Sequence, residues 1–297
     1  MNGPVARAEL ELGKTQYRAL QNVVYRTTRL QRHEAHVGPW RVPYLRGGKG
    51  PTLLLIHGFG DNKETWAPLI LLLYRHFDVI APDLLGFGEG PVVASEHMVP
   101  REQARTLLGL LDAVTDGPVH VVGQSMGAMV AAYMALAAPE RCQTLALVSA
   151  AGAAGLSPEM TSLVESGTNP LLADDLASFD VLLKLSMARR PPYPRAMRRY
   201  LAAQWGKRHE EHRRHWDRLL SVELEELRPL ETPELLPRTI LVIGDQERIV
   251  HPDNVAIYRE WFPGLRVSTF KGVGHNPHHE ATNRLARLLR EHSRSFG

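Results

Sequence analysis

The segment VHVVGQSMG at residues 119–127 constrains the fold of this chain more than any other part of its sequence. It opens with a short, mostly apolar run of strand-like composition, and the small residues that follow it favour a helix. Between them lies a G-x-S-x-G pattern in which Gly123 and Gly127 flank Ser125. A serine stands clear of the backbone on a sharp strand-to-helix turn when flanking glycines permit close approach of the chain. The segment therefore predicts an α/β architecture with Ser125 as a candidate nucleophile.

From residue 40 onward, short apolar runs alternate with amphipathic helical segments, which is typical of a mostly parallel sheet flanked by helices. The expected strands span 41–45, 52–56, 78–81, 119–122, 144–148, 239–243 and 266–270. The expected helices lie near 64–75, 101–114, 126–138, 253–261 and 280–292. A chain of 297 residues is long enough for one such domain with an insertion.

No strand-like run occurs between about 152 and 236. Apolar side chains recur there at helical spacing, as Leu176, Phe179, Leu183 and Met187 do, so we predict an inserted helical cap. The predicted organisation is an N-terminal helical extension over 1–39, a first part of the core over 40–151, the cap over 152–236 and a second part of the core over 237–297.

Charged residues nearly balance, with 35 Lys and Arg against 32 Asp and Glu, so a bulk field that would gather nucleic acid is not indicated. Basic residues concentrate over 189–218, which suits either a solvated helical face or contact with anionic lipid. Residues 5–36 are also basic and helical in pattern. We expect this stretch to pack on the domain or to lie on a membrane surface.

The chain opens without the apolar run of a signal peptide, and no window approaches the roughly 18 apolar residues of a membrane span. Its single cysteine, Cys142, excludes an intramolecular disulfide. These features lead us to expect a cytoplasmic location, with peripheral membrane contact as an open alternative.

A second motif, LLLIHGFGDNKETW at 53–66, is an apolar strand that ends in a glycine-containing turn. Backbone N–H groups fixed in such a turn can bind the negative charge of a tetrahedral intermediate without reorganising. We predict that the N–H groups of Phe59 and Met126 form this oxyanion hole. His57 precedes the turn, so we expect it to orient the loop rather than to transfer protons.

A third motif, KGVGHNPHHE at 271–280, follows the last expected strand and places His275 at the carboxyl edge of the sheet, where open α/β folds gather their ligands. His275 is the candidate base. The segment IGDQERIVHP at 243–252 offers Asp245 and Glu247 as the acid that orients it, and these residues alone leave both open. The order serine, acid, histidine matches that of α/β-hydrolases.

The remaining histidines do not suggest a metal centre. His278 and His279 lie at a helix start without a cysteine or a separated ligand pair, so we predict no zinc site there. His209, His212 and His215 drift around a helix and form a similarly weak ligand set.

Together these motifs resemble the α/β-hydrolase superfamily over residues 40–295. In that family the sharp turn that carries the serine is called the nucleophile elbow. PDLLGFGEG at 82–90 is similar to the family's loop after the strand that precedes this elbow. HGFGDNKETW and NPLLADDLASFDVLLKL are similar to bacterial lipases and esterases near the monoacylglycerol lipase branch. The resemblance implies an α/β-hydrolase fold and a serine carboxylic-ester hydrolase. It also implies an acyl-enzyme on Ser125, an ester or acylglycerol substrate, and no cofactor or metal.

The resemblance also bears on the acid. In that family it stands three residues after a glycine, in G-x-x-D, followed by two aliphatic residues and a proline. Counting from Gly244 gives Glu247, so this sequence departs from the pattern by carrying Glu for Asp and one extra residue before Pro252. We therefore favour Glu247, with Asp245 as the runner-up.

The cap would roof an apolar pocket for an acyl chain, with Leu172, Phe179 and Leu183 as candidate lining residues, although such side chains also build a cap's own core. Two other functions remain open. Hydrolysis of a carbon–carbon bond in a diketone uses the same fold and triad, and a non-catalytic small-molecule receptor can retain the fold. An arginine that points into the pocket would favour the carbon–carbon hydrolase.

Overall fold

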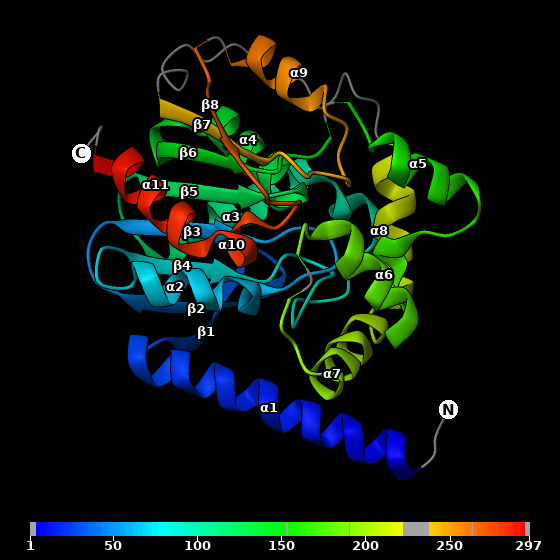
Figure 1. Ribbon diagram of the computed structural model, residues 1–297. Coiled ribbons are helices and arrows are strands. Elements are labelled where there is room, and N and C mark those ends of the chain that lie inside the picture. The colour runs from blue at the N-terminus through cyan, green and yellow to red at the C-terminus, as the bar shows by residue number, and fades with distance from the viewer. Residues whose placement is uncertain (1–3, 153, 190, 222–237, 263, 295–297) are drawn as a thin grey trace.

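The computed structural model describes residues 4–152, 154–189, 191–221, 238–262 and 264–294. An eight-stranded sheet runs through the described residues in the order β1-β2-β4-β3-β5-β6-β7-β8, antiparallel at β1, β2 and β4 and parallel from β4 to β8 (Figure 1). Its strands are β1 Gln31–Val37, β2 Trp40–Gly48, β3 Thr52–Ile56, β4 Asp78–Pro82, β5 Val119–Gln124, β6 Cys142–Val148, β7 Thr239–Gly244 and β8 Arg266–Phe270. The mostly parallel α/β sheet that the sequence predicts is confirmed.

Helices cover both faces of the sheet because its strands are apolar on both faces. Successive residues of β3 alternate between the two cores: Leu54 joins α3 (Pro100–Val114) and α4 (Met126–Ala137), whereas Leu55 joins α2 (Ala67–Leu73) and α11 (Thr282–Arg294). This is the period of two that a strand buried on both faces must show. A short helix η1 (Lys63–Trp66) precedes α2, α9 (Asn254–Trp261) follows β7, and α10 (Pro277–Glu280) precedes α11.

Further helices lie between β6 and β7. They are α5 (Pro158–Glu165), η4 (Pro170–Leu172), α6 (Leu176–Ser186), α7 (Arg195–Gly206) and α8 (His209–Ser221), and they stand to one side of the sheet (Figure 1). Phe179, Leu183 and Ala202 bury one another in a separate apolar cluster. The helical character predicted for this insertion agrees with the described part. The predicted boundary at 236 lies outside the described residues.

The N-terminal stretch differs from the helix expected over 5–36. Helix α1 spans Pro4–Thr28, and the chain then turns into β1 on the edge of the sheet. Strand β1 left no recognisable pattern in the sequence, because an edge strand with one buried residue, Ala35, lacks an apolar alternation.

Helix α1 packs against α7 and α2 (Figure 1). A Cβ on Gly13 would lie 1.9 Å from the carbonyl oxygen of Ala196, so the two helices touch through their backbones. Arg199 donates to Glu9 at 2.6 Å beside this contact. Neither α1 nor any other described helix has the length and apolar character needed to cross a bilayer.

A buried ion pair ties the loop after β3 to the loop after β4. The side chains of Lys63 and Asp83 are 2% and 0% exposed, and they form an ion pair. The N–H groups of Lys63 and Glu89 also donate to Asp83, at 2.7 and 2.8 Å, and Lys63 Nζ donates to Glu89 at 2.8 Å. Removing one partner of such a pair leaves an uncompensated charge in the core.

We expect Lys63→Ala to lower the free energy of unfolding by about 3 kcal/mol, because Asp83 keeps its charge and loses its counter-ion. Chemical denaturation at neutral pH measures the change. Lys14→Ala is the matched control, since Lys14 faces Glu11 on the surface of α1 at 3.5 Å, and its loss should cost less than about 0.5 kcal/mol. Equal effects of the two changes would contradict the bracing role of Lys63.

Candidate functional site

Ser125 lies on a strained turn between β5 and α4. Its φ of 54° and ψ of −119° are rare for a residue with a side chain. A Cβ on Gly123 would lie 2.1 Å from the Gly127 carbonyl oxygen, and a Cβ on Gly127 would lie 2.4 Å from the carbonyl oxygens of Ile56 and His57. The flanking glycines are therefore required by backbone contact, as the sequence motif predicts.

The loop after β3 packs against this turn. A Cβ on Gly58 would lie 3.1 Å from Ser125 Cβ and 2.4 Å from Gln124 Oε1. The two N–H groups expected to bind an oxyanion, those of Phe59 and Met126, lie in this loop and at the start of α4. Neither has a hydrogen-bond partner in the part of the chain that the structure describes.

His57 connects the loop after β3 to the loop after β4, and both of its ring nitrogens bond to backbone atoms. Its Nε2 accepts from the Leu84 N–H at 3.0 Å, so Nδ1 carries the proton and donates to the Gly58 carbonyl oxygen at 2.8 Å. Burial lowers the pKa of His57, which keeps the ring neutral. These contacts match the orienting role expected from its position before the turn.

His275 lies in the loop after β8, beside the elbow. The Gln124 side-chain amide donates to its carbonyl oxygen at 3.1 Å, and its own N–H donates to the Ser186 carbonyl oxygen at the end of α6 at 2.9 Å. Its Nδ1 lies 2.8 Å from Glu247 Oε2, and both side chains are almost fully buried. Ser125, Glu247 and His275 thus follow β5, β7 and β8 at one edge of the parallel sheet.

Glu247 is held as an anion although it is buried. Burial acts to raise its pKa, but the charge and hydrogen bond of His275 and the N–H groups of Ile249 and Val250 outweigh this and hold the pKa below its usual value. Those N–H groups reach Oε1 at 2.8 and 3.3 Å.

Asp245, the other candidate acid, is exposed and accepts from the Gly272 N–H at 2.7 Å. The structure therefore brings Glu247, and not Asp245, to His275. The extra residue before Pro252 does not prevent this contact, because the backbone just after Glu247 turns its N–H groups onto the carboxylate.

The end of α6 is hydrogen-bonded to both loops of the site. Besides the bond from His275, Glu280 accepts from the Ala188 N–H at 2.7 Å with Oε2 and from the Gly274 N–H at 2.9 Å with Oε1. Arg248, next to Glu247, donates to the Lys184 carbonyl oxygen. Sequence reasoning missed these contacts, since their partners are backbone atoms far away in the chain.

Aromatic side chains of α7 and α8 cover the loop that carries Phe59. The Phe59 ring lies 5.9 Å from the Trp216 ring and 5.7 Å from the His212 ring, between centroids. Trp205 lies directly on Gly60, where a Cβ would meet its ring at 2.1 Å. The sequence offered no signal for these contacts beyond the aromatic content of the helices.

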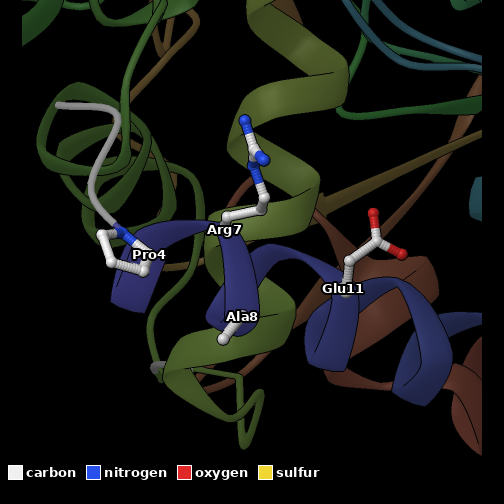
Figure 2. A pocket seen from close by; sticks show the side chains of 4 residues that line it. All are labelled: Pro4, Arg7, Ala8 and Glu11. Carbon is white, nitrogen blue, oxygen red and sulfur yellow. The ribbon is translucent and has the colours of Figure 1, made fainter.

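The three cap residues predicted to line a pocket take different places. Phe179 and Leu183 lie inside the cap's own apolar cluster, and Leu172 packs against the main core of the sheet. A hollow of about 410 Å³ lies on α1, lined by Pro4, Arg7, Ala8 and Glu11 (Figure 2). None of those four is a candidate site residue.

Known proteins are similar to this chain over most of its length. A family model described as the alpha/beta hydrolase fold matches residues 51–282. Lipase 1 of Psychrobacter immobilis is 30% identical over 83% of this chain and 78% of its own. The 2-hydroxymuconate semialdehyde hydrolase of Pseudomonas sp. (strain CF600) is 28% identical over 82% and 86%. A crystal structure of a membrane phospholipase A superposes with a TM-score of 0.84 at 28% identity, covering 96% of this chain and 92% of the other.

Because Glu247 is ionised in the folded protein, the free energy of unfolding should depend on pH. Because the native pKa is lowered, ionised Glu247 stabilises the fold above the unfolded value of about 4.3, and this contribution is lost as pH falls through the lower native pKa. We expect Glu247→Gln to cost about 2 kcal/mol at pH 6 to 7, and the cost should shrink below about pH 4.

Urea denaturation across this pH range measures the difference from wild type. Glu96→Gln changes an exposed carboxylate and is the control, with a small effect at every pH. A Glu247→Gln cost that stays constant down to pH 3 would contradict the ionised state.

Proposed function

Because this chain belongs to the α/β hydrolase family, we propose that it is a carboxylic-ester hydrolase that forms an acyl-enzyme on Ser125. The observation that carries the proposal is the contact of 2.8 Å between His275 Nδ1 and Glu247 Oε2, in a loop that Gln124 holds beside the strained turn of Ser125. A nucleophile, a base and the group that orients the base thus gather at one edge of the sheet.

The proposed cycle begins with attack of Ser125 Oγ on the ester carbonyl carbon, while His275 Nε2 takes the serine proton. The carbonyl π electrons move onto oxygen, where the N–H groups of Phe59 and Met126 stabilise the charge. When the tetrahedral intermediate collapses, the C–O bond breaks and the alcohol leaves with the proton from His275. Water, deprotonated by the same histidine, then releases the acid and restores Ser125.

Glu247 fixes the orientation of the base in this cycle. Its carboxylate accepts a hydrogen bond from the Nδ1–H of His275, which leaves Nε2 free to accept from serine. The imidazolium that forms after proton transfer is stabilised by the same carboxylate. The two backbone N–H groups on Oε1 keep Glu247 in place while its other oxygen faces His275.

We infer an ester with an acyl chain, such as an acylglycerol, as the substrate class. The names of the relatives, a lipase and a membrane phospholipase A, support this class.

Helix α1 supports a further proposal, peripheral contact with a lipid surface. Leu12 and Val23 are 52% and 59% exposed, and they share a side of the helix with Val5, which is 75% exposed. Exposed basic residues, including Arg7, Arg18 and Arg26, add attraction to anionic headgroups.

Hydrolysis of a carbon–carbon bond is the second candidate, because a relative of similar identity and coverage is named as a semialdehyde hydrolase. The basic residues of the cap keep this alternative open in the sequence, since an arginine that points into the pocket would hold a substrate carboxylate. In the structure Arg198 pairs with Asp180, Arg199 with Glu9 and Arg213 with Glu210. These three guanidinium groups already have carboxylate partners, so they are not available to hold a substrate carboxylate.

Hydrolysis of p-nitrophenyl esters from two to sixteen carbons tests the proposal. We expect activity that peaks at medium or long chains, and Ser125→Ala should lower kcat by about 10⁶-fold. Glu247→Gln should lower it by about 10⁴-fold, because the base loses its orienting anion. Asp245→Asn is the matched control and should stay within about threefold of wild type, since Asp245 contacts Gly272 rather than His275.

A loss with Asp245→Asn larger than that with Glu247→Gln would contradict the assignment of the acid. Labelling of Ser125 by a fluorophosphonate without turnover of any ester would favour carbon–carbon hydrolysis. A folded chain that neither labels nor turns over would favour a non-catalytic receptor.

Binding to vesicles tests the lipid contact separately. We expect the double variant Leu12→Glu with Val23→Glu to bind vesicles of mixed phosphatidylglycerol and phosphatidylcholine at least fivefold more weakly in a co-sedimentation assay, because two exposed apolar groups become charged. Thr15→Glu with Asn22→Glu adds the same charges at exposed polar positions of α1. Equal binding by the two double variants would contradict insertion of the apolar side of α1.

A further inference from the structure

Three side chains without a role in the proposed mechanism meet beside the loop that carries Phe59. Asp61 lies in that loop, and His278 and His279 lie on α10, just after His275. One carboxylate oxygen of Asp61 and one ring nitrogen of each histidine all lie within 4.8 Å of one another. The histidines lacked a third ligand in the sequence, and the fold supplies one from a distant loop.

Thr65, on η1, adds an oxygen at the same place. Its Oγ1 lies 3.2 Å from His278 Nε2 and 2.9 Å from His279 Nε2. Neighbouring ligand atoms around a tetrahedral zinc ion with bonds of about 2.0 Å are about 3.3 Å apart. The separations therefore suit atoms that share one ion, although a hydroxyl hydrogen-bonded to both rings gives the same distances.

A carboxylate oxygen of Asp61 without a partner in the described part of the chain favours the ion. Asp61 Oδ1 accepts from the Asn62 N–H at 2.9 Å, and no hydrogen bond or ion pair from the described ranges reaches its other oxygen. His278, whose Nε2 faces Thr65, is 1% exposed. The nearby Glu64, by contrast, is bonded to Tyr25 and Arg32. A carboxylate beside one buried and one partly buried ring, without a counter-ion among the described residues, is a group that a cation would stabilise.

We propose that Asp61, His278 and His279 bind a divalent transition-metal ion of the zinc class, with Thr65 beside it. Two imidazoles and one carboxylate are a common ligand set for such ions. The ion takes no part in ester cleavage, for which Ser125 supplies the nucleophile. It joins the loop of Phe59 to the helix that follows His275, and so clamps together the two segments that hold the oxyanion donor and the base.

Isothermal titration calorimetry with Zn²⁺ tests the site, using untagged full-length protein stripped by a chelator. We expect one ion per chain, and a Tm higher by about 5 °C at a Zn²⁺ concentration one hundred times the Kd. Asp61→Asn and His279→Gln should each weaken binding at least tenfold and remove the rise in Tm. Co²⁺ in place of Zn²⁺ should give visible absorption bands that both variants lose.

His36→Gln and His209→Gln are the controls, because they remove histidines on β1 and α8, away from α10, and should bind Zn²⁺ as wild type does. Circular dichroism confirms that each variant is folded. Absence of saturable binding by wild type would overturn the proposal. So would Kd values for folded Asp61→Asn and His279→Gln within twofold of wild type.

Discussion

Backbone contact around the end of β5 is the constraint on which the rest of this structure depends. At Gly123 and Gly127 the backbone passes so close to its neighbours that a single added carbon has no room, and at Gly58 an added carbon would meet the Gln124 side chain. These contacts bring the turn of Ser125, the start of α4 and the loop of Phe59 into one rigid unit. The unfavourable φ of Ser125 persists because β5 and most of α4 are buried in the core on both sides.

Around this unit, buried charged side chains are stabilised by ion-pair and hydrogen-bond partners rather than by water. Lys63 and Asp83 neutralise each other below the loops, and Glu247 is kept ionised by His275 and by backbone N–H groups. Each of these groups would be unfavourable alone in an apolar core. Together they hold the loops after β3, β4, β7 and β8 in fixed relation to Ser125.

The local features of the fold and site could be predicted from sequence because each leaves a local pattern. The parallel strands are apolar runs, the elbow is a glycine pattern, and His275 follows the last strand. The residues alone did not decide between Glu247 and Asp245 as the partner of His275. That contact depends on how the chain turns at Ile249 and Val250.

What escaped prediction depends on pairing between distant segments. Strand β1 is defined by its partner β2 rather than by its own composition. The meeting of Asp61 with His278 and His279 likewise needs the folded sheet to bring two loops together. The cap residues could not be placed for another reason. An apolar side chain on a helix does not show whether it lines a pocket or packs in the core of the cap.

The anchoring of α6 has a consequence for how this protein can be re-engineered. Its last turn and the residues just after it are hydrogen-bonded to the loop of His275, to Glu280 and to Arg248, so residues 184–188 are fixed to the loops of the proposed site although they lie within the insertion. A chimera that exchanges the whole insertion for that of a relative would lose these hydrogen bonds as well as the helices α7 and α8. Exchange points placed after residue 188 and before β7 would alter the helices α7 and α8 and leave the hydrogen bonds around Glu247 and His275 intact.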